Sequence, residues 1–166
     1  MLRVRIPNGF SFSHQVRALS WIAETYGNGV IDITTRQQVQ LRHLKIESIP
    51  KIFTLLEEVG LTTSQTGMDN VRNIMGCPVS GLSPKEKVDA YSLVKMLNEH
   101  IVGNPEFSNL PRKFNITLSG CPDDCVHAET QDLALVTYHT RQKMHPIEGR
   151  KYARRRESSL PVKTKK

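Results

Sequence analysis

Three separate stretches of the chain combine basic side chains with side-chain amides, the residue types that bind anions. Arg36 lies in a polar run at residues 34–38, Arg72 lies in an amide-rich segment, and a basic stretch extends from Arg112 to Asn115. Basic groups that converge suit a ligand with several carboxylates, or a small oxyanion. Each stretch alone is also typical of solvent-exposed charge, so the anion-binding hypothesis requires that the three stretches meet in space.

The chain has three cysteines, Cys77, Cys121 and Cys125, of which the last two are four positions apart. An odd number at such short spacing does not fit a disulfide framework and favours a reducing compartment. The interpretation that we favour is structural or spare thiols. A zinc site formed with His127 has a sufficient ligand count, but Cys77 is far from the other ligands in the sequence.

The positive charge of the chain is concentrated at its C-terminal end. The net charge is +7, and residues 141–166 contain ten Lys/Arg and two Asp/Glu, so the first 140 residues are close to neutral. The composition of this tail predicts disorder. A nucleic-acid-binding function would have to depend on the tail, and we do not favour it.

The length of 166 residues suits one compact domain or two small lobes that share a core. The N-terminus has the alternation of a strand rather than the pattern of a signal peptide, and no apolar run is long enough to cross a membrane. We therefore expect a cytoplasmic protein, or a stromal one if the source has plastids.

The periodicity of apolar residues predicts the elements that must position the basic groups. Alternation predicts strands at residues 2–6 and 31–41, and helical spacing predicts helices at 13–26 and 48–60. Arg36 would then project from the second strand, which is buried on one face. The order strand–helix–strand–helix is that of a split β-α-β unit of ferredoxin-like type, over residues 1–62.

Residues 63–140 show a different pattern. Residues 63–73 have neither period and predict a loop, where ligand contacts concentrate. A capping box from Ser83 to Glu86 predicts the start of a helix that ends before Gly103. Strands are predicted at residues 111–118 and 133–136. The fold class is α+β: a ferredoxin-like lobe at 1–62, part of an α/β lobe at 63–140 and a basic tail at 141–166.

Six segments, in this order, resemble the siroheme-dependent nitrite and sulfite reductases, and more narrowly the ferredoxin–nitrite reductases. They are residues 2–9, 32–37, 67–73, 103–107, 110–115 and 120–129. The resemblance covers residues 1–137. It implies a ferredoxin-like half-domain followed by part of a domain that binds siroheme and an iron–sulfur cluster.

The resemblance also implies roles for individual residues. Arg36, Arg72, Lys113 and Asn115 fall on positions that face the anion bound above siroheme, and Arg112 falls on one that pairs with siroheme carboxylates. The further candidate cofactor-binding residues of the polar stretches are Arg42, Asn70 and Asn73. The chemistry fits, because siroheme is rich in carboxylates and six-electron reduction of nitrite to ammonium needs positive charge and proton donors.

Residue 115 bears on the choice between nitrite and sulfite. The sulfite enzymes resemble this stretch but commonly have a second lysine at that position. Because a monoanion needs less positive charge than a dianion, Lys113 with Asn115 favours nitrite. The resemblance therefore implies nitrite (or sulfite) as substrate and ferredoxin as electron donor.

The cysteines depart from the family pattern. Family members hold a 4Fe-4S cluster through four cysteines of their second half, and this chain has three in all. We therefore expect a truncated or frame-shifted half of a reductase that is inactive alone. Its cluster ligands would come from a missing C-terminal half. An incomplete iron–sulfur site, or one shared between subunits, is the other interpretation of the cysteines. The alternatives are half of an assimilatory sulfite reductase, and a non-catalytic module whose tail binds nucleic acid or an acidic partner.

Overall fold

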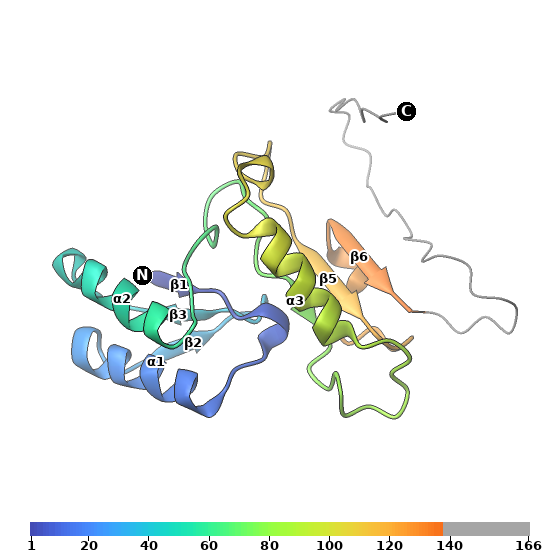
Figure 1. Cartoon of the computed structure of the whole chain (residues 1–166), viewed down its shortest axis with the longest axis horizontal. Coiled ribbons are helices and arrows are strands. Elements are labelled where there is room, and N and C mark those ends of the chain that lie inside the picture. The colour runs from blue at the N-terminus through green and yellow to red at the C-terminus, as the bar shows by residue number, and fades with distance from the viewer. Residues whose placement is uncertain (138–166) are drawn as a thin grey trace, which may run out of the picture.

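Two small sheets, one antiparallel and one parallel, lie side by side in the computed structural model, which describes residues 1–137 (Figure 1). The predicted basic tail, 141–166, lies outside the described residues. Among the helices of residues 1–137, none is long and apolar enough to cross a membrane.

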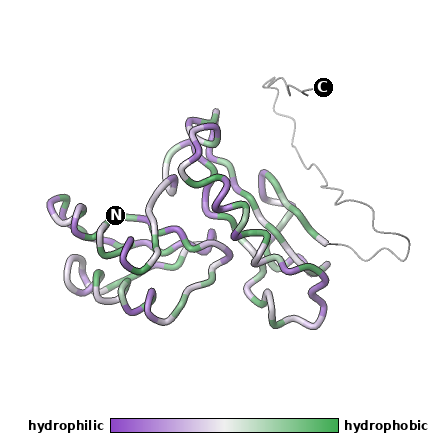
Figure 2. The backbone as a smooth tube through the Cα atoms, viewed as in Figure 1, coloured by the Kyte–Doolittle hydropathy of each residue, from purple (hydrophilic) through white to green (hydrophobic). Residues whose placement is uncertain are grey.

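The antiparallel sheet contains β1 (Leu2–Val4), β3 (Val39–Leu41) and β2 (Ile31–Ile33), in that order. Helices α1 (Ser13–Tyr26) and α2 (Ile49–Glu58) pack against it, and Figure 2 shows the alternation of polar and apolar residues along both. Their buried side chains, including Leu19, Ile22 and Ile52, form one apolar core with Val4 and Leu41 of the strands. This arrangement confirms the predicted ferredoxin-like unit.

The single strand predicted at residues 31–41 is wrong. β2 and β3 are separate strands that pair with each other, with Ile33 opposite Val39. Between them Thr34 N–H donates to Gln38 O (2.9 Å), and Gln37 has a left-handed backbone, with φ 57°. The polar run has no aliphatic side chain to bury, so it forms a turn, and Arg36 lies in this turn rather than within a strand.

The parallel sheet contains β4 (Met75–Gly76), β5 (Ile116–Ser119) and β6 (Leu133–Val136), in that order. Helix α3 (Ala90–Ile101) packs against β4 and β5 through a second apolar core that includes Val94 and Ile74. Short 3₁₀ helices occur at Pro7–Gly9, Ile46–Ser48, Pro105–Phe107 and Ala128–Thr130. The strands predicted near residues 111–118 and 133–136 are present, whereas β4 was not predicted.

The predicted capping box at Ser83–Glu86 is also wrong. Helix α3 begins seven residues later, at Ala90, and the side chain of Asp89 caps it by accepting from Ser92 N–H. The segment before it cannot be helical because Lys87 N–H donates to Gly120 O (2.7 Å). Glu86 instead accepts from Ser80 Oγ (2.6 Å), a hydrogen bond that lowers the pKa of its carboxyl group.

Candidate functional site

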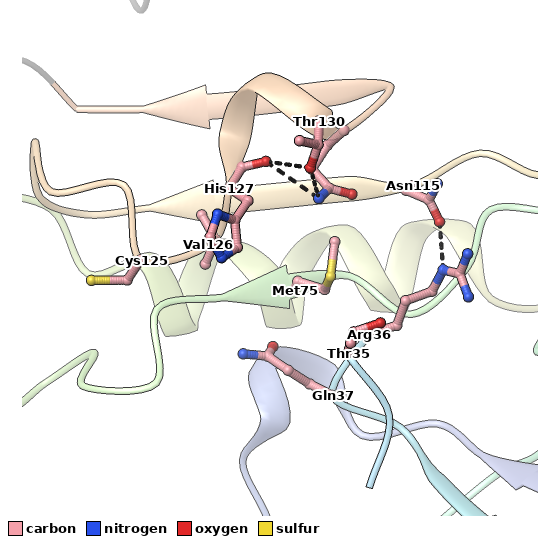
Figure 3. A pocket seen from close by; sticks show the side chains of 10 residues that line it. Thr35, Arg36, Gln37, Met75, Asn115, Cys125, Val126, His127 and Thr130 are labelled. Carbon is pink, nitrogen blue, oxygen red and sulfur yellow. Dashed lines mark hydrogen bonds between the residues drawn. The ribbon is translucent and has the colours of Figure 1, made fainter.

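A cavity of about 370 Å³ lies where the β2–β3 turn approaches the parallel sheet (Figure 3). It receives side chains from the turn, from β4, from the start of β5 and from the loop before β6. The lining residues are Thr35, Arg36, Gln37, Met75, Asn115, Cys125, Val126, His127, Thr130 and Gln131. Two of the four predicted anion-binding residues, Arg36 and Asn115, therefore line the same cavity although they are 79 positions apart.

Arg36 and Asn115 are joined by a hydrogen bond from Arg36 Nε to Asn115 Oδ1 (2.8 Å; Figure 3). The amide of Asn115 in turn donates from Nδ2 to Asp132 Oδ2 (2.9 Å). A carboxylate can only accept and a guanidinium can only donate, so this amide orientation is the one that satisfies both neighbours. Asp132 therefore orients Asn115, and Asn115 orients the guanidinium of Arg36.

We expect Asp132→Ala to loosen Arg36. Without its carboxylate partner the Asn115 amide can rotate, and one hydrogen bond of this strength corresponds to a change of about fivefold in an opening equilibrium. Nuclear magnetic resonance of the arginine Nε–H groups should show Arg36 exchanging with solvent about fivefold faster. Glu129→Ala is the control, because it removes a nearby carboxylate that does not bond to the Asn115 amide. Equal exchange rates of Arg36 in the two variants would show that Asp132 does not orient Arg36 through Asn115.

Arg72 lies in the loop that precedes β4, is 8% exposed, and donates from Nη1 to Thr66 O. Its Nε is buried without a hydrogen-bond partner among the described residues. Burial lowers the pKa of Arg72, and the positive charges of Arg3 and Arg36 lower it further, against an opposing effect of Asp69. Arg3 and Arg36 are thus each close enough to Arg72 to repel it, and a bound anion would relieve that repulsion.

Acidic partners are scarce around these groups. The ion pairs within residues 1–137 are Arg42 with Asp32 and Lys85 with Asp123. Arg36 and Arg72 therefore have no carboxylate partner in the described part of the chain. Cations that share a site without internal neutralisation are typical of anion-binding sites.

The other predicted basic residues lie elsewhere. Arg112 and Lys113 are exposed in the segment before β5, and neither lines the cavity. Arg42 is exposed and paired with Asp32, at the opposite end of β3 from the turn. The structure therefore brings Arg36, Arg72 and Asn115 together, but not these three.

The two predicted asparagines of the loop are engaged with the backbone. Asn70 donates from Nδ2 to Gly67 O (2.8 Å) within its own loop. Asn73 is fully buried, and its Nδ2 donates to Ile6 O (2.7 Å) and Arg36 O (2.8 Å). The Asn73 amide thus ties the turn that carries Arg36 to the parallel half of the structure, a role that the sequence did not indicate.

Sequence reasoning did not select Gln37 or Arg3. The Gln37 side chain pairs with the backbone of Gly76, donating from Nε2 to the carbonyl (2.7 Å) and accepting at Oε1 from the N–H (3.0 Å). Gln37 belongs to the same polar run as Arg36, and this was the feature of the sequence that could have indicated its role. Arg3 alternates with Val4 in β1, where nothing in the sequence separates it from an ordinary exposed arginine.

The thiols of Cys121 and Cys125 both act on that of Cys77, and Cys125 lies at the end of the cavity opposite Arg36. Cys77 and Cys121 are buried, whereas Cys125 is exposed and lines the cavity (Figure 3). Burial raises the pKa of Cys77, and the neighbouring thiol of Cys125 raises it further. Residues 1–137 contain no group of three or more His, Cys, Asp or Glu side chains placed to hold a metal ion, so the zinc alternative is not supported there.

Two known domain families match the chain. Residues 1–59 match the family described as the nitrite/sulfite reductase ferredoxin-like half domain, and residues 67–152 match the nitrite and sulphite reductase 4Fe-4S domain. A ferredoxin-like half-domain joined to a small parallel sheet, with a cavity between them that Arg36 lines, defines the class, and the chain belongs to the nitrite and sulphite reductase family.

Its relatives within that class are ferredoxin–nitrite reductases. The chain is 47% identical to the one from Leptolyngbya laminosa over 98% of its own length, and 42% identical to the chloroplastic one from Arabidopsis thaliana over 81%. It spans only 33% and 24% of those two proteins.

Solved structures agree on the fold. The chain is similar to the NirA protein of Mycobacterium tuberculosis, with a TM-score of 0.76 and 32% identity over 81% of this chain and 24% of that one. It also resembles the dissimilatory sulfite reductase I, with a TM-score of 0.69 at 16% identity, over 81% of this chain and 32% of that one. The second likeness concerns the fold alone.

Proposed function

We propose that this chain binds nitrite above siroheme in a ferredoxin-dependent nitrite reductase, which reduces nitrite to ammonium with six electrons. The observation that carries the proposal is the hydrogen bond between Arg36 and Asn115 at one cavity, with the buried Arg72 close enough to Arg36 for their positive charges to repel. The relatives named ferredoxin–nitrite reductase support the same substrate and the same electron donor.

The residues present fit siroheme. The buried Nε of Arg72 has no hydrogen-bond partner and Arg36 has no ion-pair partner among the described residues, so both guanidinium groups can donate to an anionic group such as a carboxylate of this macrocycle. Arg112, which is exposed before β5, is a third candidate. Arg42, Asn70 and Asn73 stay predictions, because Arg42 is paired with Asp32 and the two amides already donate to backbone carbonyls. When bound, siroheme would supply the electrons to the substrate nitrogen.

The iron–sulfur cluster is a different case. Residues 1–137 hold no set of three or more side chains placed around a metal, and the chain has three cysteines against the four that such a cluster takes. The described residues therefore do not fit a 4Fe-4S cluster by themselves.

The chain's own residues would act by charge and by hydrogen bonding. The guanidinium groups of Arg36 and Arg72 would stabilise the negative charge of nitrite and hold its oxygens. Lys113 does not line the cavity, so the proton-donor role that we propose for it, as oxygen leaves as water, requires its Nζ to reach the substrate from the exposed segment before β5. Asn115 would act mainly through Arg36, because its Oδ1 is already occupied by that guanidinium.

The use of Asn115 also supports nitrite over sulfite. A lysine at this position has no acceptor for Arg36 Nε and would add a second positive charge beside it. Such a site would suit a dianion better than a monoanion. We keep the cytoplasm, or the plastid stroma, as the proposed location.

The test is expression of the chain in cells that make siroheme. We expect the purified protein to carry a siroheme absorption band that shifts when nitrite is added, without iron–sulfur absorbance and without turnover, because the cluster ligands are incomplete. A folded chain that takes up no siroheme would overturn the proposal. Nitrite reduction by the chain alone would contradict its dependence on further cluster ligands.

A further inference from the structure

Arg5 is buried in the interior between the two sheets, with 1% of its surface exposed. It follows β1 in sequence, and its backbone N–H donates to Thr62 O (2.8 Å). No acidic side chain of residues 1–137 pairs with it, since the ion pairs there involve other residues. Burying a guanidinium costs free energy unless its donors are hydrogen-bonded, so the hydrogen-bond partners of Arg5 indicate its role in the structure.

Those partners are almost all backbone carbonyls of one loop, residues 63–73, which contains Arg72. The five hydrogen bonds run from Nε to Ser64 O (3.3 Å), from Nη1 to Arg72 O (3.1 Å) and Asn98 Oδ1 (3.4 Å), and from Nη2 to Gln65 O (3.0 Å) and Val71 O (2.9 Å). All three nitrogens of the guanidinium are engaged.

The four carbonyls that Arg5 binds come from both ends of the loop. Two of them belong to the start of the loop and two to its end, so one rigid, planar group holds both ends together. The contact to Asn98 ties the same group to helix α3. Arg72 also makes a hydrogen bond within the same loop, because its Nη1 donates to Thr66 O.

We propose that Arg5 is the positioning residue for Arg72: it shapes the loop 63–73 through four backbone carbonyls and so sets the place and direction of the Arg72 guanidinium, without touching the anion. The inference rests on the proposed function only for the statement that Arg72 binds an anion. Arginine is required because lysine has three donors on a tetrahedral nitrogen and cannot reach four carbonyls arranged around a plane.

A second consequence is electrostatic. Burial, and then the positive charge of Arg72, lower the pKa of Arg5 to about 10, so it stays charged at neutral pH. Its charge is fixed beside Arg72 and is not neutralised by any acidic residue of the described part. Arg5 thus adds to the positive potential of the site from behind the loop.

The test uses the whole chain and the variant Arg5→Lys, which keeps the charge and removes the planar fork. Two readouts are followed: amide hydrogen exchange along the chain, and the Nε–H resonance of Arg72, assigned by its loss in Arg72→Ala. We expect exchange at residues 64–73 to become at least tenfold faster, exchange in α1 and α2 to stay within twofold, and the Arg72 resonance to move and broaden. In protein loaded with siroheme, sodium nitrite should then perturb that resonance only at about tenfold higher concentration.

Arg17→Lys is the matched control, because Arg17 is exposed on α1, and we expect it to change neither readout. Unchanged exchange at 64–73 with an unchanged Arg72 resonance in Arg5→Lys would overturn the inference. So would exchange that rises equally in all elements, since that indicates a general structural role.

If Arg5→Lys does not fold, Asn98→Ala decides the question. It removes one of the five hydrogen bonds and keeps the guanidinium, so exchange at 64–73 should rise about threefold and no change there would overturn the inference. If nitrite leaves the Arg72 resonance of the siroheme-loaded, unmodified chain unchanged, the proposed function fails, and the exchange measurements still decide whether Arg5 positions the loop.

Discussion

Replacing Arg36 with alanine is expected to weaken nitrite binding to the siroheme-loaded protein about 100-fold. The variant removes a cation whose Nε is oriented by Asn115 and which has no acidic partner in residues 1–137. Removing one preoriented donor of this kind from a partly buried site costs about two orders of magnitude. Titration with nitrite, followed through the siroheme absorption band, measures the loss.

Two companion variants make the Arg36 result specific. Arg17→Ala removes an exposed arginine of α1, so it has the same charge change and should leave the titration unchanged. Arg36→Lys keeps the charge but loses the planar group that donates from Nε to Asn115 and leaves Nη1 and Nη2 for the anion, so we expect an intermediate loss. Equal affinity in Arg36→Ala and the unmodified protein would remove Arg36 from the site.

Replacing Gly76 with alanine is expected to lower the free energy of unfolding by about 3 kcal/mol. A Cβ on Gly76 would lie 1.4 Å from Asn8 Oδ1, and Asn8 is itself only 7% exposed. The backbone of Gly76 is also held on both sides by the Gln37 amide, so it cannot shift without breaking two hydrogen bonds. Urea denaturation measures the change.

The cause of the Gly76→Ala effect can be checked by a second substitution. Asn8 has a left-handed backbone, φ 58°, so Asn8→Gly fits that conformation and removes the clashing side chain. The double variant should therefore recover at least half of the lost stability, a non-additive result. Gly67→Ala is the control, because the nearest atom to its added Cβ is 4.0 Å away. Additive losses in the double variant would show that the clash with Asn8 is not the cause.

Several features were accessible from the sequence because they depend on neighbouring residues. Burial of one helix face recurs every three or four positions, and α1 and α2 were predicted on that basis. The apolar residues Ile31, Ile33, Val39 and Leu41 were correctly assigned to strands. The turn between them was missed because the alternation on both sides was read across it. The strand β4 was missed because two residues carry no period.

The interpretation of single side chains was less accessible. Glu86 has the spacing of a capping box with Ser83, but the nearby Gly120 carbonyl accepts the backbone N–H of Lys87 and holds the segment away from a helix. Asn73 lies in a segment whose composition is typical of a ligand-binding loop, yet its side-chain amide donates a hydrogen bond to the backbone carbonyl of Arg36. In both cases a hydrogen-bond partner distant in sequence determined the local structure, so the local sequence pattern did not predict it.

The sequence by itself determined the types of most elements, the order of a ferredoxin-like unit and the residue types that can hold an anion. Tertiary structure alone decided that Arg36 meets Asn115, that Arg3 approaches Arg72 and that Arg5 holds the loop between the sheets. The physical reason is that helix and strand periodicity follows from burial of near neighbours. A hydrogen bond between residues 67 or 79 positions apart instead depends on how two sheets pack and on which carbonyls that packing leaves within reach.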